Sequence, residues 1–148
     1  MKTFGQALGL SFLVIGSLVH AQKFPEPPDT QKTDLKLPSP EESAAGFTLP
    51  EGFKVNVFAA EPDVRQPIAM TFDDRGRLWV AECYTYADRT LIYNTELRDR
   101  IVIFEDTDGD GKFDKRKVFH DGLQRLTSIA LGFGGIWATC APHLVFIP

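Results

Sequence analysis

PIAMTFDDRGRLWVAE, residues 67–82, recurs in altered form as LTSIALGFGGIWATC, residues 126–140. Aligned on their tryptophans, Trp79 and Trp137, the two stretches are 58 residues apart, and the second has a turn that is one residue shorter. Each stretch consists of two β-rich runs around a Gly-containing turn, which is the pattern of a β-hairpin. The sequence therefore contains an internal repeat, and this repeat decides the predicted fold.

The repeat extends beyond the hairpin. RIVIFED (100–106) and RKVFHDG (116–122) are predicted strands that follow the first hairpin, and HLVFIP (143–148) matches RIVIFE after the second. The unit is strand, turn, strand, loop, strand, aspartate-rich loop, strand. Four antiparallel strands in this order are typical of one blade of a β-propeller. No segment shows a sustained helical period, so we predict an all-β fold, a partial β-propeller with about two four-stranded blades.

The second copy of the repeat ends before its own fourth strand. FKVNVFAA, residues 53–60, alternates in strand fashion and is predicted as a leading strand of the kind that closes the last blade of a propeller. Propellers typically have four or more blades, so we expect a propeller that is incomplete at the C-terminus, as part of a longer protein or as a truncated gene product. The alternative is a small self-contained β-sandwich of about seven strands.

The sequence before the repeat predicts three regions. Residues 1–21 carry a lysine at position 2, continue with a thirteen-residue apolar run and end in VHA, which is the pattern of a secretory signal peptide. This pattern predicts an exported, periplasmic or extracellular protein without a membrane span after cleavage. Residues 22–50 are rich in proline and charge and are predicted to be a linker or an N-terminal arm, in which PSPEES can cap one short helical turn. Residues 51–148 form the predicted propeller domain.

The charge balance and the cysteines exclude some functions. The formal net charge is −4 and no stripe of lysine and arginine is present, which argues against nucleic-acid binding. There are two cysteines, Cys83 and Cys140, and no C-x-x-C-H haem-attachment motif. Export permits a disulfide, but the repeat places these cysteines on opposite faces of neighbouring blades, so a bridge is not favoured.

EDTDGDGKFDK, residues 105–115, is the main candidate site. We call it the aspartate loop. The alternating aspartates and the two glycines allow hard oxygen ligands to converge, as Ca²⁺ requires. The predicted core ligands are Asp106, Asp108 and Asp110, and the carbonyl of Lys112 and the carboxylate of Asp114 are expected to add to them. The loop is not an EF-hand, because Lys117 occupies the twelfth position and strands flank it. The alternative is an acidic turn with solvated charges, and in either case the expected role is structural.

Several polar and aromatic residues outside the aspartate loop are further site candidates. Glu82 ends the second strand, where it could line a site, cap a channel or pair with an arginine. His120 and His143 lie at strand ends and are expected to be structural. Tyr84, Tyr86 and Tyr93 lie in the long connection after the first hairpin, where they either stack on a sugar or pack the connection onto the blade. Trp79 and Trp137 are predicted to lie in the core between blades.

Residues 50–148 closely resemble the N-terminal part of exported proteins from planctomycetes and related bacteria that are labelled membrane-bound dehydrogenases. The resemblance is carried by EGFKVNVFAAEPDVRQPIAMTFDDRGRLWVAE, by RIVIFEDTDGDGKFDKRKVFHDGL and by GGIWATCAPHLVFIP. The propeller of that family is similar to the soluble glucose/sorbosone dehydrogenases, which are six-bladed and hold pyrroloquinoline quinone. Many members carry further modules, including c-type cytochrome domains.

The resemblance implies oxidation of a sugar or alcohol, in which a base takes the hydroxyl proton and the quinone accepts two electrons. The catalytic His, Arg and Lys residues of the sugar dehydrogenases come from later blades, so no catalytic or quinone-binding residue is carried over to this sequence. These residues alone are therefore expected to be inactive. The competing hypothesis is a non-catalytic, Ca²⁺-stabilised propeller that binds a glycan or a protein partner.

Overall fold

The computed structural model describes residues 36–86 and 92–148. The predicted signal peptide and the first part of the predicted linker lie outside these residues. Within them the chain forms one short helix and seven strands, which are α1 Pro40–Ala45, β1 Pro67–Phe72, β2 Leu78–Glu82, β3 Asp99–Glu105, β4 Lys115–Leu123, β5 Leu126–Gly132, β6 Gly135–Cys140 and β7 His143–Ile147. No helix among the described residues is long and apolar enough to cross a membrane.

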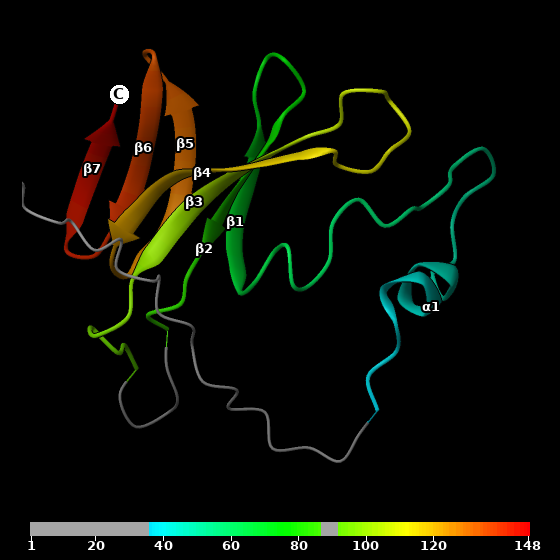
Figure 1. Cartoon of the computed structure of the whole chain (residues 1–148), viewed down its shortest axis with the longest axis horizontal. Coiled ribbons are helices and arrows are strands. Elements are labelled where there is room, and N and C mark those ends of the chain that lie inside the picture. Colours follow the sequence, from blue (N-terminus) through cyan, green and yellow to red (C-terminus); the bar gives the residue numbers. More distant parts are fainter. Residues whose placement is uncertain (1–35, 87–91) are drawn as a thin grey trace, which may run out of the picture.

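The strands form two antiparallel sheets, which Figure 1 shows side by side. The first sheet has the order β1-β2-β3-β4 and the second has the order β5-β6-β7. This confirms the predicted all-β class, the four strands of the first repeat and the three strands of the second. The sheets do not join into a closed ring, and their mutual packing runs mainly through β1 and β5.

The two sheets share the same register. Phe72 pairs with Leu78 at the tight end of the first hairpin, and Leu131 pairs with Ile136 at the corresponding place in the second. An irregularity lies at the start of both hairpins, after Pro67 in β1 and after Leu126 in β5. Because even this departure from regular pairing is repeated, the sequence repeat corresponds to a repeat of structure.

One apolar core lies between the sheets, and it uses opposite faces of the two repeats. The first sheet contributes the face that carries Trp79, Ala81 and Ile101, and the second contributes the face that carries Ile129 and Ile136. Since side chains of a strand alternate between its two faces, each sheet has one face in this shared core. We call the opposite face of each sheet its outer face.

The outer face of the first sheet is covered only in part. Val80, Val102 and Phe104 are buried there beneath Phe58, Val64 and neighbouring residues of the segment before β1. The part of this face that belongs to β1 is exposed, so the cover does not extend across the whole sheet.

Two predictions about single segments need correction. Residues 53–60 do not form a strand, because Phe53 and Val55 are 73% and 41% exposed and the segment contacts the aspartate loop instead of a sheet edge. Trp79 lies in the core as predicted, but Trp137 is 36% exposed because its side chain points to the outer face of the second sheet. The predicted helical turn is confirmed as α1, where Ser39 and Glu42 form a reciprocal capping box.

Candidate functional site

The aspartate loop connects β3 to β4 and is the yellow loop between these strands in Figure 1. The chain reverses there with Gly109 and Gly111 at φ +78° and +87°, a backbone conformation that favours glycine. Oxygens of Asp106, Asp108 and Asp114 lie within 4.8 Å of one another. The structure therefore brings together three of the four predicted aspartates.

The loop amides offset part of this negative charge. Gly109 N and Gly111 N donate to the two carboxylate oxygens of Asp106, at 2.7 and 2.9 Å. The backbone N and the hydroxyl of Thr107 both donate to Asp114, and the backbone hydrogen bond is the main cause that lowers the pKa of that carboxyl. Hydrogen bonds from the loop therefore fix the positions of the Asp106 and Asp114 carboxylates.

Asp110 and Lys112 lie beside this group. Asp110 N donates to Asp108, and the Asp110 carboxylate in turn accepts from Lys112 N at 2.7 Å. The role of Asp110 and of the Lys112 carbonyl as metal ligands stays a prediction. The donor set consists of hard oxygens, which suits Ca²⁺ and does not suit a soft transition metal.

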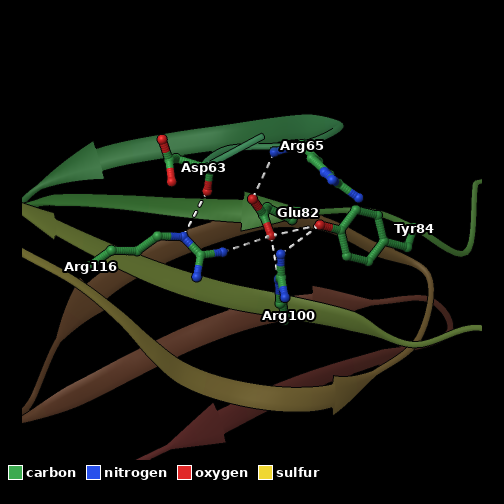
Figure 2. Close-up of polar contacts among 6 residues, drawn as sticks. All are labelled: Asp63, Arg65, Glu82, Tyr84, Arg100 and Arg116. Carbon is green, nitrogen blue, oxygen red and sulfur yellow. Dashed lines mark hydrogen bonds and ion pairs between the residues drawn. The ribbon is translucent and has the colours of Figure 1, made fainter. Parts of the chain in front are cut away.

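Glu82 is the centre of a second polar cluster (Figure 2). Its side chain is fully buried at the end of β2. Arg100 Nε donates to Glu82 Oε2, the Tyr84 hydroxyl donates to the same oxygen at 3.2 Å, and Arg65 N donates to Oε1 at 2.8 Å. Arg100 Nη2 also donates to the Tyr84 hydroxyl at 2.6 Å. Of the roles considered for Glu82, the structure shows the pairing with arginine.

Arg116 approaches the same carboxylate from β4. Its Nη2 lies 3.9 Å from Glu82 Oε2 and its Nε donates to the carbonyl of Asp63 (Figure 2). Its guanidinium also lies over the ring of Phe104. The cluster thus ties β2, β3 and β4 to the segment before β1. The Glu82 carboxylate is therefore enclosed by hydrogen bonds and by two arginine side chains, which leaves it poorly placed to act as a mobile base.

Tyr84 is buried with Glu82. Burial is the largest cause that raises its pKa to about 12, and the negative charge of Glu82 adds to the effect while Arg100 opposes it. Of the two roles considered for the tyrosines, Tyr84 therefore packs the connection onto the sheet. Tyr86 is 64% exposed and forms an edge contact with Tyr93, with ring centroids 6.0 Å apart, so sugar stacking by this pair stays a prediction.

Asp99 forms a third buried polar centre, which the sequence did not single out. One oxygen accepts from Thr85 N at 2.7 Å, and the other accepts from the Thr85 hydroxyl at 2.7 Å and from Leu126 N at 2.8 Å. Leu126 begins β5, so Asp99 joins the two sheets. Cys83 and Cys140 are free and buried, and burial together with the charge of Asp99 raises the pKa of both thiols.

Asp73 organises the first hairpin turn. It accepts from Arg77 N at 2.9 Å, from Arg77 Nε at 2.7 Å and from the Trp79 indole at 3.0 Å. Burial by itself raises the pKa of Asp73, but the hydrogen bonds from Trp79 and Arg77 outweigh it and lower the pKa to about 2. His120 and His143 lie outside these clusters, in β4 and at the start of β7.

The arginines around Glu82 were missed by the sequence analysis. Glu82 and Arg100 are direct cross-strand partners, so a correct alignment of β2 with β3 would have paired them. The contact from Arg116 depends on a long side chain that lies along the sheet, and no spacing in the sequence indicates it.

Comparison with protein families places this chain in a family described as "Domain of unknown function (DUF7133)", whose model matches residues 39–148. The match covers most of the chain, so the chain belongs to this family. No curated protein and no solved structure matched the chain.

Proposed function

We propose that the two sheets are consecutive blades of an exported β-propeller that resembles the quinone-dependent sugar dehydrogenases. In this proposal the chain provides a calcium-stabilised scaffold and does not provide the reacting groups. The observation that supports it best is the packing of two sheets that are related by the repeat. The first sheet uses the face that carries Trp79, and the second uses the face opposite to the one that carries the equivalent Trp137, as stacked blades require.

The scaffold role is supported by the buried acids, whose oxygens already have structural hydrogen-bond partners. Glu82 is fully buried at the start of the connection between β2 and β3, and it is engaged by Arg100 and Tyr84. Asp99 is used to join the two sheets. Glu82 and Asp99 are therefore engaged by structural partners, and we assign no step of sugar oxidation to either of them.

Calcium is assigned to the aspartate loop because of its donor set. Asp106, Asp108 and Asp114 already converge, and Asp110 and the Lys112 carbonyl are the neighbouring oxygens that could complete the coordination. Ca²⁺ takes six to eight oxygen ligands, so water would supply the remainder. An ion here would neutralise the charge repulsion in the loop and hold β3 and β4 at their junction.

The loop also contacts the segment before β1. Phe113 N donates to the carbonyl of Phe58 at 3.3 Å, and the side-chain amide of Asn56 donates to the carbonyl of Gly111. Calcium binding is therefore expected to order this segment as well as the loop, and to stabilise the first sheet.

The test is a calorimetric titration of the purified chain with CaCl₂ and with MgCl₂, together with thermal unfolding. We expect one Ca²⁺ site and a rise in stability of about 2.7 kcal/mol when the free Ca²⁺ concentration is a hundred times its Kd. Asp108→Asn should weaken binding at least about tenfold, because one ligand charge is lost. Asp74→Asn, an exposed aspartate in the first hairpin turn, is the matched control and should bind normally.

Two results would contradict the proposal. Absence of a Ca²⁺-dependent heat and of thermal stabilisation would remove the calcium assignment. Sugar-dependent dye reduction by this chain with added pyrroloquinoline quinone would overturn the scaffold role, since we expect none.

A further inference from the structure

A cavity of about 660 Å³ opens between the turns of the two hairpins. Residues of the β1–β2 turn line one side of it and residues of the β5–β6 turn line another, so both sheets contribute. Pockets that hold small molecules measure about 300–1,000 Å³ and combine apolar walls with a few polar groups. The cavity therefore has the size of a small-molecule site, and its lining decides which class of molecule fits.

Three large apolar side chains form one part of this lining. They are Trp79, Phe119 and Leu131, and the rings of Trp79 and Phe119 meet edge to face with their centroids 4.8 Å apart. Phe119 and Leu131 are half-buried and pack against the core shared by the two sheets, which holds them in place. An aromatic wall of this kind favours a ligand that contains a ring.

Glycines form the part of the lining that comes from the second hairpin turn. Gly132 and Gly134 both border the cavity, and a Cβ at either position would meet no atom within 4 Å. Phe133 lies between them and is 94% exposed, so its ring is in solvent. The second turn therefore leaves open the space that side chains would otherwise occupy.

Arg77 is the polar group that suits a ligand best. Its Nε donates to Asp73 Oδ2 at 2.7 Å, and its guanidinium lies 5.7 Å from the centroid of the Trp79 ring, so two contacts orient it. Its two terminal nitrogens make no hydrogen bond to the residues that the structure describes, and the side chain is 28% exposed. A planar guanidinium held in this way presents paired N–H donors to a carboxylate.

The acidic groups of the cavity do not compete for that role. Asp73 Oδ1 accepts from the backbone N of Arg75 and of Arg77, and Oδ2 accepts from Arg77 Nε and from the Trp79 indole. Each carboxylate oxygen has two lone pairs, so the acceptor capacity of Asp73 is used. Asp74 and Arg75 also line the cavity, and their opposite charges, both exposed, largely cancel. Arg77 is thus the charged group that selects the ligand, and it favours an anion.

We infer that this cavity binds a small aromatic carboxylate, with its ring against Trp79, Phe119 and Leu131 and its carboxylate on the terminal nitrogens of Arg77. The ring buries apolar surface, and the carboxylate receives charge-assisted hydrogen bonds from a donor that is already fixed. The inference uses neither the aspartate loop nor the arrangement of the sheets as blades, so it stands or falls apart from the proposed function.

The experiment titrates the purified, ¹⁵N-labelled chain with 2-naphthoate and follows its amide and indole N–H signals by NMR. Saturable shifts are expected at the Trp79 indole and at the backbone amides of Gly132 and Gly134. Two control compounds separate the parts of the ligand, since 2-naphthylmethanol has the rings without the charge and acetate has the charge without the rings. Each should bind at least about tenfold more weakly than 2-naphthoate.

Two variants test the two sides of the cavity. Arg77→Gln should weaken binding of 2-naphthoate at least about tenfold and leave the weak binding of 2-naphthylmethanol unchanged, which a misfolded chain would not do. Gly132→Val places a side chain in the open space and should weaken binding of both compounds. Lys117→Gln removes an exposed positive charge outside the cavity, and this control should bind normally.

Three results would overturn the inference. They are the absence of saturable shifts in the unaltered chain, equal affinity of that chain for 2-naphthoate and for either control compound, and undiminished binding of 2-naphthoate by Arg77→Gln. If Arg77→Gln does not fold, the comparison of the three compounds on the unaltered chain still decides the matter.

Discussion

At the scale of single residues, buried charge is stabilised by several partners at once. Glu82 has no contact with water, and Arg100, Tyr84 and the Arg65 amide satisfy its oxygens. Removing a carboxylate from water is costly unless opposite charge and hydrogen bonds replace the solvent. The hydrogen bonds that offset the cost of burying the Glu82 carboxylate also occupy the oxygens that a reaction would need.

We predict that Glu82→Gln destabilises the chain by about 1–3 kcal/mol, because the partly buried side chains of Arg100 and Arg116 lose their counter-charge. Urea unfolding measures this change, and Glu51→Gln at an exposed turn position is the control. In the double variant Glu82→Leu/Arg100→Met much of the loss should be recovered. A decrease in the free energy of unfolding below about 1 kcal/mol for Glu82→Gln would show that the pairing of this carboxylate with the arginines does not stabilise the fold.

At the scale of elements, the sequence predicts those helices and hairpins whose stabilising interactions join residues close together in the chain. The hairpins were predictable because apolar alternation and turn glycines act over a few residues. Helix α1 was predictable because Ser39 and Glu42 form its capping box. Residues 53–60 have the alternation of a strand, but they contact the aspartate loop and pack over Val80 and Phe104, and a sequence pattern does not contain that information.

The candidate site divides in the same way. The convergence of acidic oxygens follows from alternation within one loop, so the sequence was enough to predict it for Asp106 and Asp108. Asp114 joins them in the structure, where the sequence had placed Asp110 in the core set. The cluster around Glu82 joins residues from β2, β3 and β4, and its geometry depends on a register set across the long connection 83–98. Trp137 was misplaced because the repeat identifies equivalent positions but does not say which face of the last sheet is covered.

The two glycines of the aspartate loop provide a matched prediction at this scale. Gly109→Ala and Gly111→Ala both place a side chain at positive φ, which costs about 1–2 kcal/mol. At Gly111 the new Cβ would also lie 2.5 Å from the side-chain nitrogen of Asn56, whereas the space at Gly109 is open. Gly111→Ala should therefore destabilise the chain more in urea unfolding. In an Asn56→Ala background the two should become equal, and a difference that persists there would contradict the packing of Asn56 on the loop.

At the scale of the whole molecule, the shared core is the feature that makes two sheets into one folded unit. Ile101, Leu126 and Ile136 are fully buried in it, and they come from both sheets. Asp99 adds a polar link, because it accepts from Leu126 at the start of the second sheet. If the sheets are stacked repeats with a common core, neither should unfold without the other.

The tryptophans offer the most direct test of this central claim, since each sheet contains one at the equivalent position. In Trp137→Phe, the fluorescence of Trp79 reports on the first sheet, and in Trp79→Phe the fluorescence of Trp137 reports on the second. We predict that each fluorescence transition in urea coincides with the far-UV circular dichroism transition of the same variant. A Trp137 transition with its own, lower midpoint would show that the second sheet unfolds independently, and it would contradict the account of two consecutive blades around one core.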